Sequence, residues 1–349
     1  MNKIVPFLII PLVLIGCSDP KSFEVNETEA RESARYDLAI TQKMKQLKRL
    51  PYQAINPENE ATDEKIKLGH ALYFENELSL EGNNSCNSCH DLAAFGVDNL
   101  PTSPGDAGET GDRNSPTVLN AALHSSQFWD GRAKDLEEQA GMPIMNPVEM
   151  AIPSEQFLVD RLTTNEYYQE LFKKAFPNEE NPISYTNLRK AIAVFERQLL
   201  TPSRYDAYLK GDVNALSVQE KKGLMSFASV GCMTCHNGAL LGGTMLQKFG
   251  VHKDYWTLTG SKHIDLGKAS QTGEEYDKYV FKVPSLRNIA KTAPYFHDGS
   301  VKDLSEAVKI MADAQLNYKL SEDELSNIVA FLGALTGEVP VKYQTAPSR

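Results

Sequence analysis

The sequence predicts a mainly α-helical protein built from two similar domains with long loops. Apolar residues recur at helical spacing in several segments, whereas few segments alternate between polar and apolar residues as strands do. The pentapeptide Cys-x-x-Cys-His occurs twice, at residues 86–90 and 232–236, and a second block of matching residues follows each copy. The length of 349 residues is sufficient for two domains and a terminal extension.

The first 17 residues are typical of an export signal. Lys3 precedes a short apolar run from Ile4 to Ile15, which is too short to span a bilayer. The run leads into Leu-Ile-Gly-Cys17, which resembles the lipobox of bacterial lipoproteins and implies cleavage before Cys17 and a lipid anchor on its thiol. The alternative is a plain secretory signal with an incidental cysteine. Both interpretations export the chain, and the first makes it a periplasmic, membrane-anchored lipoprotein.

Residues 18–50 are predicted to be a tether followed by an N-terminal helix. Residues 18–33 are polar and rich in acidic side chains, which is typical of a flexible tether. The helix is predicted from a set of apolar residues at helical spacing. These are Tyr36, Ile40, Met44 and Leu47.

The two Cys-x-x-Cys-His motifs are the attachment signature of c-type haem. The cysteines form thioethers to the haem vinyl groups, and the following histidine is placed to ligate the iron. The residues are Cys86, Cys89 and His90 in the first copy, and Cys232, Cys235 and His236 in the second. A zinc knuckle or a thioredoxin-like redox pair would leave the repeated histidine unexplained. Cys17 is the fifth cysteine, so none remains for a disulfide framework.

The residues after the two motifs indicate a duplication. Pro116-x-x-x-Asn120 matches Pro284-x-x-x-Asn288, a separation of 168 residues, and the Phe-x-Asp-Gly blocks at 128–131 and 296–299 keep that separation. Together with the motifs, this predicts two cytochrome c-like haem domains, at residues 51–205 and 206–349.

The same separation pairs Pro143 of the first domain with Met311 of the second. Thioether sulfur binds haem iron and raises its potential, whereas proline cannot ligate iron. Met311 is therefore a candidate sixth ligand of the second haem. The alternative is a core residue, because Met311 shares a helix face with Leu304 and Val308.

Several later segments predict helices with defined starts. Residues 185–199 carry apolar side chains at helical spacing, and a helix is expected to begin near Asp303. Ser217-Val-Gln-Glu220 and Ser321-Glu-Asp-Glu324 both fit a capping box. The formal net charge of −10 argues against nucleic acid as a partner and favours a basic or locally complementary redox protein.

From about Thr62 to Thr336 the sequence resembles the bacterial dihaem cytochrome c peroxidases. The segments that carry the resemblance are residues 85–90, 113–117, 127–133, 148–150, 281–288 and 292–299. The resemblance implies that hydrogen peroxide is reduced to water at the N-terminal haem. It also implies that a small cytochrome c or a copper protein delivers electrons to the C-terminal haem. A homodimer is a further expectation from the family.

The resemblance also assigns roles to individual residues. His90 and His236 match the proximal iron ligands, and Met311 matches the sixth ligand of the second haem. Glu149 and Gln139 match the distal acid–base group and its helper in the peroxide pocket, and Trp129 matches a tryptophan between the haems. His297 matches a histidine near the second haem that does not bind iron. A calcium ion between the domains is implied at three positions, Asn114, Thr292 and Pro294.

One departure from the family concerns the resting state of the first haem. Many relatives close this haem with a histidine on a loop after the first motif. Here the corresponding residue is Asp106, and no histidine lies between His90 and His124. The hypothesis is that the first haem is open at rest, so that peroxide reacts without prior reduction of the second haem.

Two other functions remain as alternatives. A protein-oxidising enzyme of the same superfamily also has an open first haem, but a tyrosine replaces the methionine at the second, so Met311 favours the peroxidase. A dihaem electron carrier needs no acid–base group and has both irons fully ligated. Replacement of Glu149 distinguishes the carrier, because only a peroxidase depends on that side chain.

Overall fold

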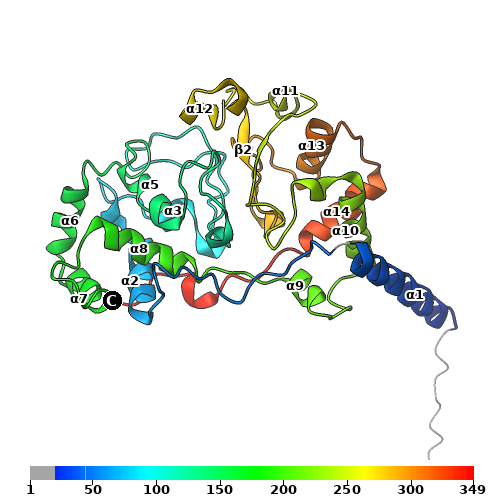
Figure 1. The fold of residues 1–349 in the computed structure, drawn as a ribbon, viewed down its shortest axis with the longest axis horizontal. Helices are drawn as coiled ribbons and strands as arrows, with labels where there is room; N and C mark the ends of the chain where they lie inside the picture. Colours follow the sequence, from blue (N-terminus) through cyan, green and yellow to red (C-terminus); the bar gives the residue numbers. More distant parts are fainter. Residues whose placement is uncertain (1–19, 44) are drawn as a thin grey trace, which may run out of the picture.

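The computed structural model describes residues 20–43 and 45–349, which form two lobes side by side (Figure 1). The predicted export signal, including Cys17, and Met44 lie outside the described residues. Within the described part of the chain, no helix combines the length and apolar character needed to cross a membrane.

The described residues are mainly helical, as the sequence predicted. The helices are α1 (Pro20–Lys43), α2 (Asp63–Tyr73), α3 (Cys86–Cys89), α4 (Leu136–Gln139), α5 (Met142–Met145), α6 (Glu155–Thr163), α7 (Glu166–Ala175), α8 (Tyr185–Glu196), α9 (Arg204–Leu209), α10 (Val218–Val230), α11 (Tyr255–Thr259), α12 (Ala269–Thr272), α13 (Leu304–Leu316) and α14 (Glu322–Gly333). Two short strands, β1 (Leu246–Lys248) and β2 (Val280–Lys282), pair antiparallel with Gln247 opposite Phe281.

The first lobe is organised by the crossing of α2 and α8. Gly69 of α2 lies directly against the backbone of α8, since a Cβ atom at this position would be 2.0 Å from the carbonyl oxygen of Ala191. Only glycine permits this approach. Helices α6 and α7 complete an apolar core around the crossing, in which Leu68, Phe172 and Ile192 are fully buried.

The second lobe repeats this crossing with α10 and α14. A Cβ atom on Gly223 of α10 would be 1.9 Å from the carbonyl oxygen of Asn327. Both predicted capping boxes form in this lobe. The Ser217 hydroxyl accepts from the Glu220 amide while the Glu220 carboxylate accepts from the Ser217 amide, and Ser321 with Glu324 does the same. These reciprocal bonds satisfy amides that would otherwise lack partners at the first turn.

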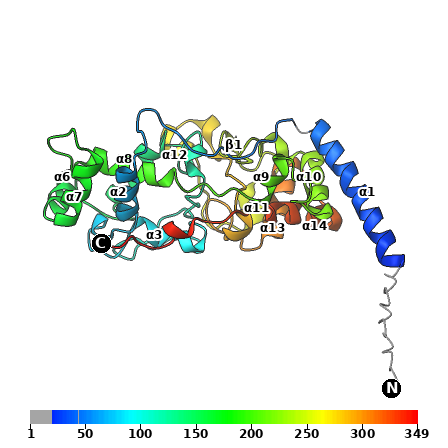
Figure 2. The same cartoon turned by 90° about the horizontal axis from the view of Figure 1, so that it is seen from below.

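Helix α1 differs from its prediction, because it begins at Pro20 and most of the segment expected to be a flexible tether is helical. The C-terminal half of the helix lies on the second lobe, where Ile40 is buried in the core. Lys221 of α10 donates to Ser33 and Asp37, which gives the polar face a defined partner. Sequence composition alone does not reveal such a partner. In Figure 2 this helix projects from one end of an elongated molecule.

The C-terminal segment leaves the second lobe after α14 and crosses back to the first (Figure 1). There Val339 and Tyr343 pack with Tyr73 and Phe195 in a small apolar cluster. The backbone carbonyl of Thr345 accepts from His70 of α2 at 3.0 Å. The end of the chain therefore stabilises the lobe that the first half of the sequence builds.

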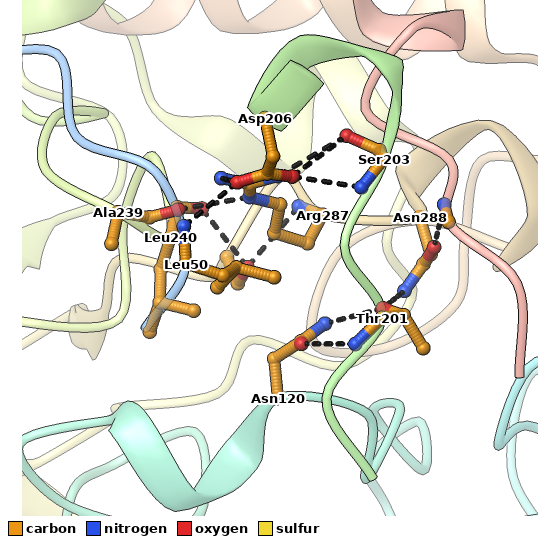
Figure 3. Close-up of polar contacts among 11 residues, drawn as sticks. Leu50, Asn120, Thr201, Ser203, Asp206, Ala239, Leu240, Arg287 and Asn288 are labelled. Atoms are coloured by element: carbon orange, nitrogen blue, oxygen red, sulfur yellow. Dashed lines mark hydrogen bonds and ion pairs between the residues drawn. The ribbon is translucent and has the colours of Figure 1, made fainter. Parts of the chain in front are cut away.

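A buried set of hydrogen bonds joins the lobes around Thr201, in the connection between them (Figure 3). Its hydroxyl accepts from the amide groups of both Asn120, at 2.9 Å, and Asn288, at 2.8 Å. The two asparagines are the matching residues of the sequence repeat, and both adopt left-handed backbone angles, with φ of 63° and 61°. Each side-chain oxygen accepts a backbone amide, from Thr201 and Gly337 respectively. The equivalent asparagines of the two lobes thus donate to the same hydroxyl group, that of Thr201.

A second buried contact fixes the start of α9 on the second lobe (Figure 3). Asp206 accepts two hydrogen bonds from the Arg287 guanidinium, at 2.5 and 3.0 Å, and one from the Leu50 amide. Burial alone would raise the pKa of Asp206, but the bonds from Arg287 outweigh it and lower this pKa.

Candidate haem and peroxide site

The two Cys-x-x-Cys-His motifs open into one continuous cavity between the lobes. Cys86, Cys89 and His90 line it from the first lobe, and Cys232, Cys235 and His236 line it from the second. These four cysteines form no disulfide with one another or with any other described residue. The structure therefore brings together the six residues that the sequence assigned to two haem groups.

The thiols are unsuited to the alternative chemistries. Burial raises the pKa of Cys86 strongly and that of Cys232 to about 11. A redox-active cysteine needs a lowered pKa, because the thiolate is the reactive form. No group of three or more histidine, cysteine or acidic side chains arranged to hold a metal ion occurs within residues 20–43 and 45–349. The site fits thioether attachment better than a zinc knuckle or a redox pair.

The two motif histidines are both buried, and their ring nitrogens have different surroundings. The Nδ1 atom of His236 lies 2.9 Å from the carbonyl oxygen of Leu241, which fixes the ring and leaves Nε2 for a ligand. His90 Nδ1 is buried without a hydrogen-bond partner among the described residues. Burial lowers the pKa of both rings, which keeps them neutral, the state that binds iron.

Equivalent positions in the two lobes form opposite parts of the cavity wall. Four residues around α4 and α5 match four residues of α13 at the separation of 168, and all eight line the cavity. The pairs are Leu136 and Leu304, Gln139 and Ala307, Ala140 and Val308, and Pro143 and Met311. Helix α13 is continuous, whereas in the first lobe the helix is interrupted between α4 and α5, next to Pro143. The ring of proline cannot fit a helix interior, which explains the interruption.

This pairing separates the two sites chemically. Met311 offers a thioether sulfur to the cavity on the side of the second motif, while Pro143 offers no ligand on the side of the first. Gln139 places an amide where the second lobe has only Ala307. The role of Met311 as an iron ligand stays a prediction.

Glu149 lies on the loop after α5 and lines the cavity, as Gln139 does, close enough to the first motif for its charge to act on Cys89. Its carboxylate accepts from the Asn146 side chain at 3.0 Å, and its backbone carbonyl accepts from the Asp106 amide at 2.7 Å. Burial raises the pKa of Glu149 despite the opposing charge of Arg132. A buried carboxyl group with a raised pKa suits proton transfer near neutral pH.

Asp106, the residue in the place of the family's closing histidine, does not line the cavity. Its carboxylate accepts from the backbone amides of Glu81, at 2.5 Å, and Asn83, at 2.9 Å. Burial opposes ionisation of Asp106, but these backbone hydrogen bonds prevail and lower its pKa. The side chain thus connects the loop before the first motif to the loop that carries Gly105, and it is unavailable to the iron.

Trp129 lines the cavity that both motifs share. Its indole nitrogen donates to the carbonyl oxygen of Asn114 at 2.9 Å, and its own carbonyl accepts from the Lys282 amide at 2.6 Å. The neighbouring Asp130 pairs with Arg113, which also pairs with Asp265 of the second lobe. The tryptophan is therefore held by contacts from both lobes.

The three residues predicted to bind calcium also line this cavity. The backbone amide of Asn114 donates to the carbonyl oxygen of His297 at 2.7 Å. This bond keeps Asn114 close to the segment that contains Thr292 and Pro294. The available donors are amide and backbone oxygens, which Ca²⁺ accepts. The calcium ion stays a prediction.

His297 is 2% exposed and stacks on Phe281 at a ring-centroid distance of 4.2 Å. It also contacts Trp129 edge to face, at 6.4 Å. The expected place of His297 near the second haem, without binding its iron, stays a prediction.

Sequence reasoning missed four residues of the cavity wall. Arg132 lies 3.5 Å from the ring centroid of Phe128, so it covers that ring. His124 Nδ1 and Lys282 Nζ are 3.0 Å apart, and burial lowers the pKa of Lys282 to about 7. Glu196 is the fourth of these residues and also lines the cavity. No spacing rule singles these residues out, although Arg132 and Lys282 fall within the segments of family resemblance.

Comparisons with known proteins agree with this site. A profile of the family described as di-haem cytochrome c peroxidase matches residues 63–214. The chain is 46% identical over 292 residues to the cytochrome c551 peroxidase of Nitrosomonas europaea, covering 83% of this chain and 84% of that protein. It is 46% identical over 291 residues to the cytochrome c551 peroxidase of Pseudomonas aeruginosa, covering 82% and 83%.

A more distant group is also similar. The methylamine utilization protein MauG of Methylorubrum extorquens is 32% identical over 324 residues, covering 89% of this chain and 88% of that protein. The crystal structure of a MauG-like protein associated with microbial copper homeostasis superposes with a TM-score of 0.77 at 28% identity. It covers 86% of this chain and 98% of the other. On these matches, and with both haem-attachment motifs on one cavity, the chain belongs to the di-haem cytochrome c peroxidase family and is an oxidoreductase that acts on peroxide.

Proposed function

We propose that this chain reduces hydrogen peroxide to water at a haem on the first motif, with electrons that enter through a haem on the second. The observation that carries the proposal is the difference between equivalent walls of one cavity. The first side presents Gln139, Glu149 and Pro143, which suit a reacting ligand. The second presents Met311, which suits a permanently ligated electron carrier.

The two haems would be held by the motif residues. Cys86 and Cys89 would form the thioethers of the first, with His90 as its proximal ligand; Cys232, Cys235 and His236 would do the same for the second. When bound, the two haem groups supply the iron to which peroxide binds and the route by which electrons reach it.

Glu149 is the proposed acid–base group. Reduction of one hydrogen peroxide consumes two electrons and two protons and yields two waters. The carboxylate of Glu149 would take the proton from the oxygen nearer the iron and return it to the far oxygen as the O–O bond breaks. Burial, which raises the pKa of Glu149, supports this exchange. Gln139 would orient the peroxide through its amide.

Trp129 is proposed to mediate electron transfer between the haems, because it lines the cavity that both motifs share. The donor would be a small cytochrome c or a copper protein. We further propose duplication of an ancestral haem domain, a calcium ion at Asn114, Thr292 and Pro294, and export as a lipoprotein anchored through Cys17. The equivalent helix crossings at Gly69 and Gly223 support the duplication.

The first site is proposed to be open at rest. The Asp106 carboxylate is engaged by the Glu81 and Asn83 amides, and Pro143 offers no ligand. The test is to mix fully oxidised, donor-free holoprotein with hydrogen peroxide and follow the haem absorption and EPR spectra. We expect a prompt spectral change. A reaction that begins only after one electron is added would mean that another residue closes the site, and no reaction in either state would indicate an electron carrier.

A further inference from the structure

Glu196 is a buried carboxyl group on the cavity wall that the proposed reaction does not use. It is the last residue of α8, is 4% exposed, and faces the cavity on the side of the first motif. The adjacent Arg197 pairs with Glu137 instead of Glu196. Burying an ionised carboxyl group away from an ion-pair partner is costly, so the group favours its neutral form.

The surroundings of Glu196 favour its protonated, neutral form. Burial raises the pKa of Glu196 to about 8, against the opposing charge of Arg197. The Arg197 guanidinium is itself 2.7 Å from both carboxylate oxygens of Glu137, so little of its charge is left for Glu196. The C-terminal end of α8 also disfavours a negative charge.

The other titratable groups around Glu196 are neutral near pH 7. Tyr73 of α2 and Cys86 of α3 both have raised pKa values, for which burial is the main cause and the charge of Glu196 a further one. His70 of α2 stacks on Phe195, and burial lowers the pKa of His70. Glu196 thus lies close enough to the first motif for its charge to act on Cys86, as the charge of Glu149 acts on Cys89.

The second lobe provides an internal comparison. Ile192 and Ile328, Phe195 and Phe331, and Leu199 and Leu335 are identical pairs separated by 136 residues. This register places Leu332 opposite Glu196, and both residues line the cavity. Equivalent positions beside the two motifs therefore carry a carboxyl group in the first lobe and an apolar side chain in the second.

We propose that Glu196 is the redox-linked proton acceptor of the first haem, and that the contrast with Leu332 helps to separate the potentials of the two haems. This inference rests on the proposed attachment of haem to both motifs. Reduction of the first haem adds one electron from the donor, and one proton from solvent binds the Glu196 carboxylate. The net charge of the site is then unchanged. The second haem, beside Leu332, has no such group at this position.

The pH dependence follows from the charge. Below the pKa of Glu196 the carboxyl group is already neutral and reduction takes up no proton. Between this pKa, which applies beside the oxidised haem, and the higher pKa of Glu196 beside the reduced haem, each tenfold fall in proton concentration makes reduction tenfold less favourable, or about 59 mV for a one-electron couple. Above the higher pKa, reduction again takes up no proton. The potential of the first haem should therefore fall with rising pH, starting near the pKa of Glu196, while the second haem shows no such fall.

The test is a potentiometric titration of both haems in the holoprotein from about pH 6 to about pH 10. Glu196→Gln keeps the shape of the side chain, and we expect it to abolish the tenfold-per-pH-unit dependence of the first haem without changing the second. Glu137→Gln releases Arg197, whose positive charge should move the onset to lower pH. Leu332→Glu should introduce a pH dependence at the second haem.

The outcomes are distinguishable. An unchanged first-haem profile in Glu196→Gln overturns the proposal. If that variant does not incorporate haem, an unshifted onset in Glu137→Gln overturns it instead. The haem content of the wild-type protein, measured first by pyridine haemochrome, tests the proposed function separately: wild-type protein without two covalent haems would refute that function. A wild-type protein with two haems and a flat first-haem profile would refute only the role of Glu196.

Discussion

Replacing Glu149 with glutamine should abolish most peroxide turnover while leaving both haems in place. Of the described residues that line the cavity, only Glu149 and Glu196 carry a carboxyl group, and Glu196 lies on α8 rather than on the loop after α5. Positioned proton transfer contributes about 10²- to 10⁴-fold to the rate, so turnover should fall by that factor, a loss of roughly 3–5 kcal/mol of transition-state stabilisation.

The assay is steady-state oxidation of a reduced small cytochrome by hydrogen peroxide. The matched control is Glu138→Gln on α4, whose carboxylate accepts only the exposed Lys134 amide; it should keep normal turnover. Haem absorption of both variants should equal that of the wild type. Turnover in Glu149→Gln within a factor of about three of the wild type would refute the acid–base role.

Three further outcomes are expected. Met311→Ala should lower the potential of the second haem and slow its reduction by the donor, measured by redox titration and stopped flow, since thioether ligation raises haem potential; an unchanged potential would make Met311 a core residue. Gly223→Ala should destabilise the protein by about 1–3 kcal/mol because its Cβ would meet the Asn327 carbonyl, whereas Gly333→Ala in α14, where nothing lies within 4 Å, should stabilise it by up to about 1 kcal/mol in denaturant unfolding. Arg287→Ala should cost about 3–5 kcal/mol by leaving the buried carboxylate of Asp206 unpaired. Because the pKa of Asp206 is lowered in the folded state, this contribution is complete above its unfolded pKa of about 3.9 and is lost as pH falls through the lower folded value, so wild type and variant should converge in acid. A constant difference down to about pH 2 would contradict this.

The parts of the site that the sequence predicted are those with fixed local spacing. The two motifs and the positions of Pro143 and Met311 follow from short patterns and one repeat distance, and the structure places them on one cavity. The capping boxes at Ser217 and Ser321 are equally local, because three residues determine them.

What the sequence did not predict depends on contacts between distant segments. The polar N-terminal stretch is helical in part because Lys221, which lies far along the chain, pairs with Asp37. The return of the C-terminal segment to the first lobe depends on Tyr343 meeting Phe195, and no local pattern indicates it. The sequence did not identify Glu196 for the same reason, because its burial depends on the packing of α8 against the cavity.

The two lobes differ in chemistry at few positions of a shared frame. The helix crossings and the asparagine contacts to Thr201 are equivalent in both lobes, so the two lobes share one frame. Three equivalent positions on the cavity wall differ between the lobes. Gln139, Pro143 and Glu196 of the first lobe correspond to Ala307, Met311 and Leu332 of the second. Each substitution makes the first side more polar or leaves it without a ligand. A peroxide site needs both properties, because the substrate must reach the iron and protons must reach the substrate. An electron-entry site needs neither, since an iron with the proposed sulfur ligand in an apolar wall would keep its coordination as it changes charge. The proposed duplication would therefore divide the two tasks between two lobes that share one scaffold.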